Sequence, residues 1–207
     1  MRRAESDRKY SEHPDRFTGA PSAFSGWALE RMARIGRPLE VLELGCGPGR
    51  DSRALAAAGH SVRAVDHSRV ALERARAAPG NPVTLRFELR DAEAAVRDSP
   101  TASLDVVYAH ALYMLLSGVE MERLLTGVHR ALRPGGLHLF AVRSVSDPLA
   151  GAGEEIEPDV YVGGPHVTPV RYYRAETVDA MAERGFRLLD AEYHPELHLY
   201  FVCHARP

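Results

Sequence analysis

The sequence predicts an α/β fold, a doubly wound seven-stranded sheet that is mostly parallel and ends in an antiparallel pair of strands. Short apolar runs alternate with amphipathic helical stretches between residues 39 and 142. This alternation predicts right-handed β-α-β crossovers with helices on both faces of the sheet. Near the end of the sequence, residues 194–196 separate two further apolar runs. So short a connection joins antiparallel strands only.

Composition indicates an ordinary folded domain. The 207 residues are 45% hydrophobic and 26% charged, which predicts a single domain over residues 1–207. The formal net charge of −2 argues against nucleic-acid or anionic-membrane partners. The two cysteines form no CxxC pair, and no long apolar run is present, so we expect a cytoplasmic protein. A monomer or a homodimer is expected.

The first elements form an N-terminal arm and cap helix over residues 1–38. Residues 1–21 are polar and interrupted by Pro14, Gly19 and Pro21, which predicts an irregular arm. From Ser22 onward, apolar residues recur at helical spacing until Gly36. This pattern predicts one amphipathic helix.

The central elements follow in a regular order. The predicted strands cover residues 39–44, 61–65, 83–87, 104–108 and 137–142. The predicted helices cover residues 51–58, 69–78 and 119–132, and each is followed closely by glycine or proline.

The last third begins with residues 144–170, which are rich in proline, glycine and acidic residues and have no clear periodicity. A stretch this long is typical of a lid or binding loop, or of disorder, and we expect a lid-like loop. A helix over 176–184 and strands over 186–193 and 197–203 complete the chain. No metal site is expected, because the turn at Pro195 breaks the strand that would align the polar side chains nearby: His194, Glu196, His198 and His204.

The most informative segment is the glycine-rich turn after the first predicted strand, Glu43-Leu44-Gly45-Cys46-Gly47-Pro48-Gly49. Such a turn brings bare backbone close to a ligand and directs the next helix N-terminus at it. Ligands of open α/β sheets bind at the carboxyl ends of the strands. A dinucleotide fingerprint would place Gly or Ala at position 50, but Arg50 stands there.

The turn, together with Glu43 before it, resembles the first motif of class I S-adenosylmethionine-dependent methyltransferases. The resemblance implies a Rossmann-like fold with S-adenosylmethionine as cofactor. It places Glu43 near the cofactor ammonium group, and it places these residues around the methionine portion: Gly45, Cys46, Gly47, Gly49 and Arg50.

Acidic residues after the next two strands extend this resemblance. Asp66 follows Gly45 by 21 residues (66 − 45 = 21), close to the ~20-residue spacing of a ribose-binding carboxylate. The resemblance places His67 against the adenine and lets Asp91 and Ala92 bind the adenine edge.

Two later segments, 104–116 and 132–137, are similar to the fourth and fifth motifs of the same superfamily. The short chain and the residues Gly49-Arg50-Asp51-Ser52 look most like the small bacterial tellurite-resistance and thiopurine methyltransferases. The resemblance covers residues 39–143 in motifs and 171–204 in layout.

The resemblance implies methyl transfer to a small-molecule thiol, metalloid oxyanion, amine or hydroxyl by in-line displacement. His110, after the fourth predicted strand, is the candidate catalytic base and a cofactor neighbour, and Tyr113 is a second catalytic candidate. The candidate substrate residues are Tyr10, Arg143, His166, Arg171 and Tyr172. The alternatives are a non-catalytic S-adenosylmethionine-binding protein and an NAD(P)-dependent oxidoreductase.

Overall fold

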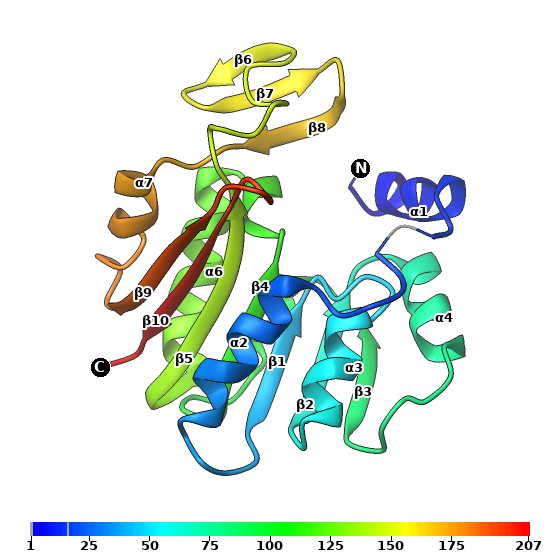
Figure 1. The fold of residues 1–207 in the computed structure, drawn as a ribbon, viewed down its shortest axis with the longest axis vertical. Coiled ribbons are helices and arrows are strands. Elements are labelled where there is room, and N and C mark those ends of the chain that lie inside the picture. Colours follow the sequence, from blue (N-terminus) through cyan, green and yellow to red (C-terminus); the bar gives the residue numbers. More distant parts are fainter. Residues whose placement is uncertain (1, 16) are drawn as a thin grey trace.

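The computed structural model describes residues 2–15 and 17–207. A seven-stranded sheet with the order β3-β2-β1-β4-β5-β10-β9 forms its centre (Figure 1). The strands are β1 (Glu40–Leu44), β2 (Ser61–Asp66), β3 (Leu85–Leu89), β4 (Leu104–His110), β5 (Leu132–Arg143), β9 (Arg187–His194) and β10 (Leu199–Ala205). The strands from β3 to β5 are parallel, and β10 is antiparallel to both β5 and β9. The predicted fold class is therefore confirmed.

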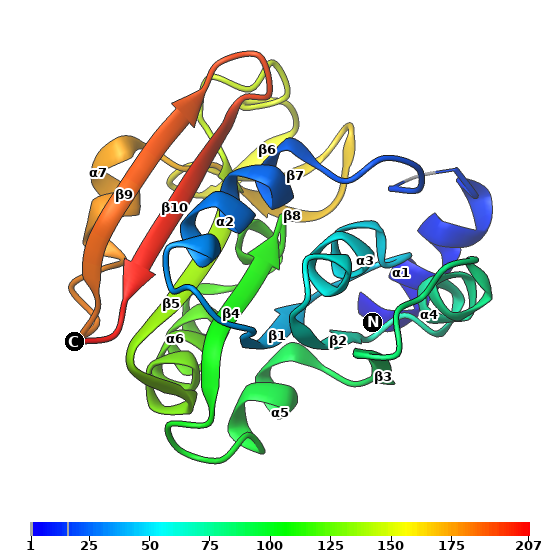
Figure 2. The ribbon, with the colours of Figure 1, turned by 60° about the horizontal axis from the view of Figure 1, so that its bottom comes forward.

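Helices cover both faces of the sheet. The α-helices are α1 (Arg2–Glu12), α2 (Ala23–Ala33), α3 (Arg50–Ala57), α4 (Arg69–Ala77), α5 (Ala92–Arg97), α6 (Gly118–Ala131) and α7 (Ala175–Ala180), and η1 (Tyr113–Leu115) is a 3₁₀ turn. Apolar side chains of α2, α3 and α4 form one core with one face of the strands. Those of α5, α6 and α7 form a second core on the opposite face (Figure 2).

Strand alternation builds these two cores from one sequence pattern. In β1, Val41 belongs to the core under α2 and α3, whereas Leu42 and Leu44 belong to the core under α5 and α6. All three side chains are at least 98% buried. A strand buried on both faces has the continuous apolar run that the sequence contains. Because β1, β2 and β4 are parallel, their carboxyl ends lie at one edge of the sheet.

The first difference from the sequence prediction is the N-terminal segment, which contains helix α1 where an irregular arm was expected. This helix is almost entirely polar and lacks an apolar stripe, so periodicity does not identify it. Polar contacts hold it against α4: the Asp7 carboxylate accepts a hydrogen bond of 2.6 Å from the Ser68 hydroxyl. That contact places α1 beside the start of α4 (Figure 1).

The second difference lies in residues 144–170, which fold into a three-stranded antiparallel sheet and not an irregular loop. Its strands are β6 (Glu154–Glu157), β7 (Val160–Gly163) and β8 (His166–Arg171). Every residue of β6 is exposed, so no alternation of apolar and polar residues marks it in the sequence. The small sheet lies beyond the ends of β4 and β5, where β8 contacts η1 (Figure 1).

Smaller differences concern short helices. Helix α5 has six residues and was not predicted, and α7 ends at Ala180, four residues before the predicted end. Among the described residues, no helix has the length and apolar character needed to cross a membrane.

Candidate cofactor-binding and active site

The glycine-rich turn joins β1 to α3 in a conformation that requires its glycines. Gly45, Gly47 and Gly49 have positive φ angles of 71°, 54° and 79°, a region that other residues rarely adopt. The backbone N–H groups of Gly45 and Cys46 donate to the Val65 carbonyl at 2.9 and 3.0 Å. The turn is thereby tied to β2 and presents bare backbone at the edge of the sheet.

Gly49 has the least room for a side chain. A Cβ atom at this position would lie 2.6 Å from the Phe87 ring, whereas a Cβ at Gly59 would meet nothing within 4 Å. Both residues have positive φ, so Gly59→Ala is a matched control for backbone strain. We expect Gly49→Ala to lower the free energy of unfolding by about 2–4 kcal/mol, and Gly59→Ala by only about 1 kcal/mol. Urea unfolding of the two variants measures the difference, and equal losses would contradict the close packing at Gly49.

Glu43, the penultimate residue of β1, is a buried carboxylate with an unused oxygen. The residue is 3% exposed, and Oε2 has no hydrogen-bond partner. Burial, with the nearby negative charge of Asp51, raises the pKa of Glu43 to about 8. A cation stabilises a buried carboxylate, so Glu43 Oε2 can accept a hydrogen bond from an ammonium group.

Asp66 ends β2 and connects the glycine-rich turn to the next helix. One carboxylate oxygen accepts from the Gly47 N–H at 2.8 Å, and the other accepts from the Ser68 N–H at 2.7 Å. The residue is 6% exposed, and burial raises its pKa above the usual aspartate value. Each oxygen keeps a second lone pair, so the carboxylate can still accept from ligand hydroxyl groups.

Helix α1 lies over the same turn. The Ser6 hydroxyl is 2.8 Å from His67 Nε2, and Arg3 Nε donates to the His67 carbonyl at 2.9 Å. A Cβ atom at Gly47 would lie 2.8 Å from the Tyr10 hydroxyl. Tyr10, predicted to contact substrate, is thus placed directly against the glycine-rich turn.

Asp91 follows β3 at this edge and caps α5. The residue is exposed, and its Oδ1 accepts from the N–H groups of Glu93 and Ala94 at 2.9 and 3.3 Å. Ala92 is the first residue of α5. Both cap contacts involve Oδ1, so capping leaves Oδ2 for other partners.

His110 ends β4 beside the start of α3. Its Nδ1 lies 3.1 Å from a carboxylate oxygen of Asp51, and that same oxygen accepts from the hydroxyl of Tyr108 at 2.9 Å. Arg50 Nη2 is 3.5 Å from His110 Nδ1. Asp51 lies in the first turn of α3, where acidic residues are common, so only the structure identifies it as a partner of His110.

Comparisons with known proteins agree on this part of the chain. Residues 41–136 match the family model of a methyltransferase domain. The matched segment runs from β1 into β5, so this part of the chain is similar to a methyltransferase domain. S-adenosylmethionine is the cofactor of this family.

Two curated relatives match about half of this chain. Hemagglutinin 1 of Eikenella corrodens is 29% identical over 114 residues, covering 55% of this chain and 37% of the relative. The cypemycin N-terminal methyltransferase of a Streptomyces species is 36% identical over 109 residues, covering 48% and 41%. The chain therefore spans about two fifths of the length of these relatives.

A solved structure gives a comparison over nearly the whole chain. The Burkholderia thailandensis 1,6-didemethyltoxoflavin-N1-methyltransferase, determined with S-adenosylhomocysteine and 1,6-didemethyltoxoflavin bound, has a TM-score of 0.74. The match covers 99% of this chain and 86% of that chain at 20% identity. At this identity the match shows that the methyltransferase fold is shared.

Tyr113, the second catalytic candidate, lies in the core of the fold. The side chain is fully buried, and its hydroxyl is 2.7 Å from His138 Nε2. Tyr113 is in the 3₁₀ turn η1, where the chain turns its side chain toward β5 and not toward the sheet edge. The prediction placed it one helical turn after His110, and no regular helix is present there.

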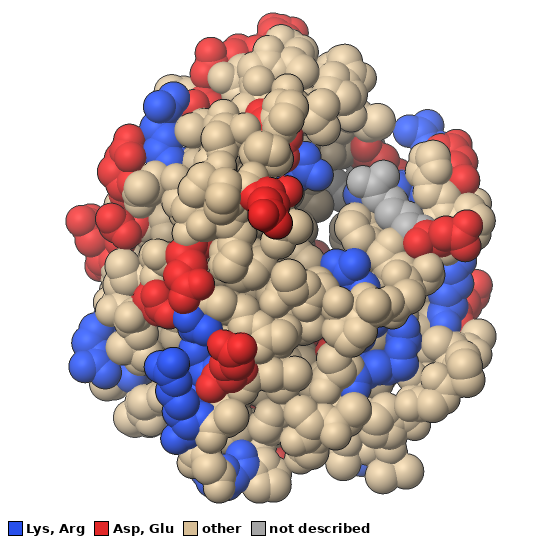
Figure 3. Space-filling model, in the orientation of Figure 1, with Lys and Arg blue, Asp and Glu red and all other residues tan. Residues whose placement is uncertain are grey.

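The other predicted substrate residues lie on the β5 and β8 side. Arg143 forms an ion pair of 3.1 Å with Asp147, and Arg171 forms one of 2.6 Å with Glu157. The Tyr172 hydroxyl and His166 Nε2 are 3.2 Å apart and buried. Figure 3 shows a hollow between this side of the molecule and α1.

The side chains of Trp27 and His204 are both buried. Trp27 is 7% exposed and packs in the core between Phe24 and Phe201. The polar residues around Pro195 do not converge, since His204 is fully buried within β10, and no group of metal-binding side chains is found in residues 2–15 and 17–207.

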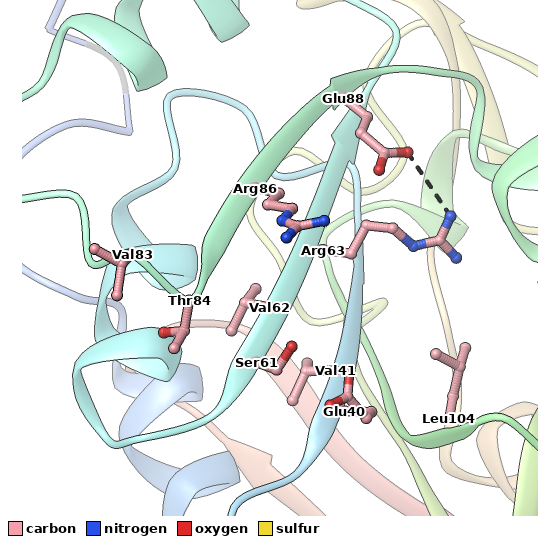
Figure 4. A pocket seen from close by; sticks show the side chains of 10 residues that line it. All are labelled: Glu40, Val41, Ser61, Val62, Arg63, Val83, Thr84, Arg86, Glu88 and Leu104. Atoms are coloured by element: carbon pink, nitrogen blue, oxygen red, sulfur yellow. Dashed lines mark ion pairs between the residues drawn. The ribbon is translucent and has the colours of Figure 1, made fainter.

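A separate hollow of about 430 Å³ lies at the opposite ends of β1, β2 and β3. Figure 4 shows the Arg63–Glu88 ion pair of 3.7 Å across it. It is lined by the first residues of these strands, away from the glycine-rich turn. Because ligands of this fold bind at the carboxyl ends of the strands, it is not the cofactor site.

Proposed function

We propose that the chain binds S-adenosylmethionine along the carboxyl ends of β1, β2 and β4 and transfers its methyl group to a small-molecule acceptor. The buried Glu43 carboxylate, whose Oε2 has no hydrogen-bond partner among the described residues, carries this proposal. A site that holds a positively charged amino acid portion against bare backbone needs a buried acceptor of this kind. An oxidoreductase site for pyrophosphate would instead be harmed by a carboxylate there.

The proposed cofactor residues each have a role that follows from their position. Glu43 stabilises the ammonium group, and Asp66 accepts from both ribose hydroxyls. His67, Asp91 and Ala92 contact the adenine. The glycine-rich turn surrounds the methionine portion of the cofactor. The residues proposed to contact that portion are Gly45, Cys46, Gly47, Gly49, Arg50 and His110.

The chain's contribution to the reaction is placement of the acceptor and exclusion of water. When bound, S-adenosylmethionine would supply an activated methyl carbon, to which an acceptor bonds in line while S-adenosylhomocysteine leaves. Holding the acceptor about 3–3.5 Å from that carbon is worth several kcal/mol of the barrier. Helix α1 with Tyr10 covers the turn from one side, and the small sheet that contains β8 lies across the hollow (Figure 3).

The acceptors to test first are small molecules. The residues Gly49-Arg50-Asp51-Ser52 resemble the tellurite-resistance and thiopurine branch, so the metalloid oxyanions and thiols of that branch belong in the screen. Amines and hydroxyl compounds complete the set. Arg143 and Arg171, each paired with a single carboxylate, are suited to bind an anionic group on the acceptor.

Calorimetric titration of the purified chain with S-adenosylhomocysteine tests the proposal, with NADH as the control ligand. We expect binding of S-adenosylhomocysteine at roughly micromolar concentration, about −8 kcal/mol, and no heat with NADH. Binding of NADH alone, or of neither ligand, would contradict the assignment of the turn.

Formation of S-adenosylhomocysteine from S-adenosylmethionine in the presence of a screened acceptor then separates an enzyme from a non-catalytic binding protein.

A further inference from the structure

Asp51 is a buried carboxylate that receives hydrogen bonds from two other elements of the fold. Its Oδ1 accepts from the Ser22 N–H at 2.8 Å, and its Oδ2 accepts from the Ser22 hydroxyl at 2.7 Å. Oδ2 also accepts from the Tyr108 hydroxyl at 2.9 Å and lies 3.1 Å from His110 Nδ1. The residue is 3% exposed. The carboxylate is therefore fixed in place by the cap of α2 and by β4 together.

These contacts keep Asp51 ionised. Burial alone would raise its pKa, but the hydrogen bonds from His110 and Ser22 outweigh burial and hold the pKa well below the usual range. An ionised carboxylate accepts hydrogen bonds and cannot donate them. Its contact with His110 Nδ1 consequently requires a proton on Nδ1.

Arg50 is a second possible hydrogen-bond partner of His110 Nδ1, beside Asp51. A guanidinium only donates, so a hydrogen bond from Arg50 would need an unprotonated Nδ1. Its 3.5 Å distance lies at the limit of a hydrogen bond, whereas the 3.1 Å contact with Asp51 is charge-assisted. The Asp51 contact therefore decides the tautomer, and the neutral imidazole has its lone pair on Nε2.

The Nε2 atom of His110 is available to a ligand. Among the described residues no side chain or backbone group forms a hydrogen bond with it. The His110 side chain is 18% exposed, and the Phe24 ring packs 5.5 Å from the imidazole. A ring held by packing on one side and by a carboxylate at Nδ1 presents Nε2 in a defined direction.

We propose that Asp51 is a positioning residue that holds His110 in the Nδ1–H tautomer, so that Nε2 removes a proton from a hydroxyl or amine acceptor. This inference rests on the proposed function and narrows its acceptor class. In the step, an acceptor lone pair forms the bond to the methyl carbon, and the electrons of the breaking C–S bond go to sulfur. The acceptor proton passes to His110 Nε2 and then to solvent.

The acceptor class follows from the need for a base. A thiol is ionised to a useful extent near neutral pH and needs no base, whereas a hydroxyl or a protonated amine needs a base to remove its proton. A fixed His–Asp pair at the edge of the site is therefore expected for oxygen or nitrogen acceptors.

Nitrogen NMR of the histidine ring tests the tautomer directly and needs no acceptor. In ¹⁵N-labelled full-length chain, with the His110 signals assigned by loss in His110→Gln, we expect a protonated Nδ1 and an unprotonated Nε2. In Asp51→Asn the side-chain amide can donate to Nδ1, so we expect the proton to move to Nε2. A proton on Nε2 in the unsubstituted chain, or an unchanged tautomer in Asp51→Asn, would overturn the proposal.

Tyr108→Phe is the matched control for stability. It removes another donor to the same Asp51 oxygen but leaves the carboxylate in place, so the His110 tautomer is expected to persist. A tautomer that changes equally in Tyr108→Phe would show that general loosening, and not the carboxylate, is responsible.

Activity measurements separate this inference from the proposed function. If the unsubstituted chain does not bind S-adenosylhomocysteine, the proposed function fails, whatever the NMR result. If it binds the cofactor, we expect turnover of a phenol or amine acceptor to fall by about 10²–10⁴-fold in His110→Ala, and the acid limb of the pH–rate profile to shift in Asp51→Asn. Turnover of thiols alone, with no change in His110→Ala, would contradict a base.

Discussion

Replacing Asp66 by alanine is expected to weaken S-adenosylhomocysteine binding by at least about 100-fold. The proposed ribose contacts are two charge-assisted hydrogen bonds of about 1.5–3 kcal/mol each, and about 1.4 kcal/mol corresponds to a factor of ten. The substitution also frees the Gly47 and Ser68 N–H groups that Asp66 now holds, which loosens the turn itself. Calorimetric titration gives the affinity, and thermal unfolding shows whether the variant is folded.

Two variants make this result interpretable. Asp98→Ala removes an aspartate that pairs with Arg90 and Arg97 on the surface, and it is expected to leave the affinity unchanged. Asp66→Asn keeps an oxygen acceptor of the same shape and should lose less affinity than alanine. Unchanged affinity in a folded Asp66→Ala variant would exclude the ribose assignment.

Acidification is expected to destabilise the fold through a buried pair of histidines. His138 and His204 are both fully buried, their rings lie 5.7 Å apart, and neither nitrogen of His204 has a partner. Burial lowers the pKa of His204 from 6.5 to about 4 and lowers the pKa of His138 as well. Both are therefore neutral in the folded chain at neutral pH.

The direction of the pH effect follows from these lowered pKa values. Below about pH 6.5 the unfolded chain takes up a proton at each histidine, while folded His204 does not until about pH 4. Stability is therefore complete above pH 6.5 and is lost as the pH falls toward 4, by about 3 kcal/mol for His204 alone.

Urea unfolding at about pH 7.5 and about pH 5 measures this loss. His204→Leu removes two unpaired buried nitrogens and is expected to flatten the pH dependence while keeping or raising the stability at neutral pH. Substituting glutamine for the exposed His13 is the control and should leave the pH dependence as it was. An equal loss of stability in His204→Leu would assign the acid sensitivity to other groups.

The central sheet could be predicted because its strands are buried on both faces and its helices are amphipathic. Strand β1 and helix α6 show this clearly. Their apolar residues recur at strand and helix spacing, and Ser117 caps α6. Helix α1 and strand β6 gave no such signal because both are held by polar contacts and neither buries an apolar face. Periodicity detects burial, so elements without burial escape it.

The candidate site shows the same division. Parallel topology places the residues that follow β1, β2 and β4 at one edge, so Glu43, Asp66 and His110 could be chosen from the sequence alone. Tyr113 could not be placed, because η1 is a single 3₁₀ turn that directs the side chain into the core. Asp51 has no signal in the sequence because its partners, Ser22 and His110, are distant along the chain and meet only through the fold.

The position of β10 inside the sheet has a consequence for folding during synthesis. Leu137 of β5 pairs with Ala205 of β10, and among the described residues β9 pairs only with β10. Neither neighbour of β10 therefore reaches its final pairing before residue 205 has been made. Until then the nascent chain carries β5 as an unpaired edge with a long run of apolar side chains. Exposed edges of this kind promote association between chains. Heterologous expression is therefore expected to depend on chaperones that shield β5 until the last strand emerges.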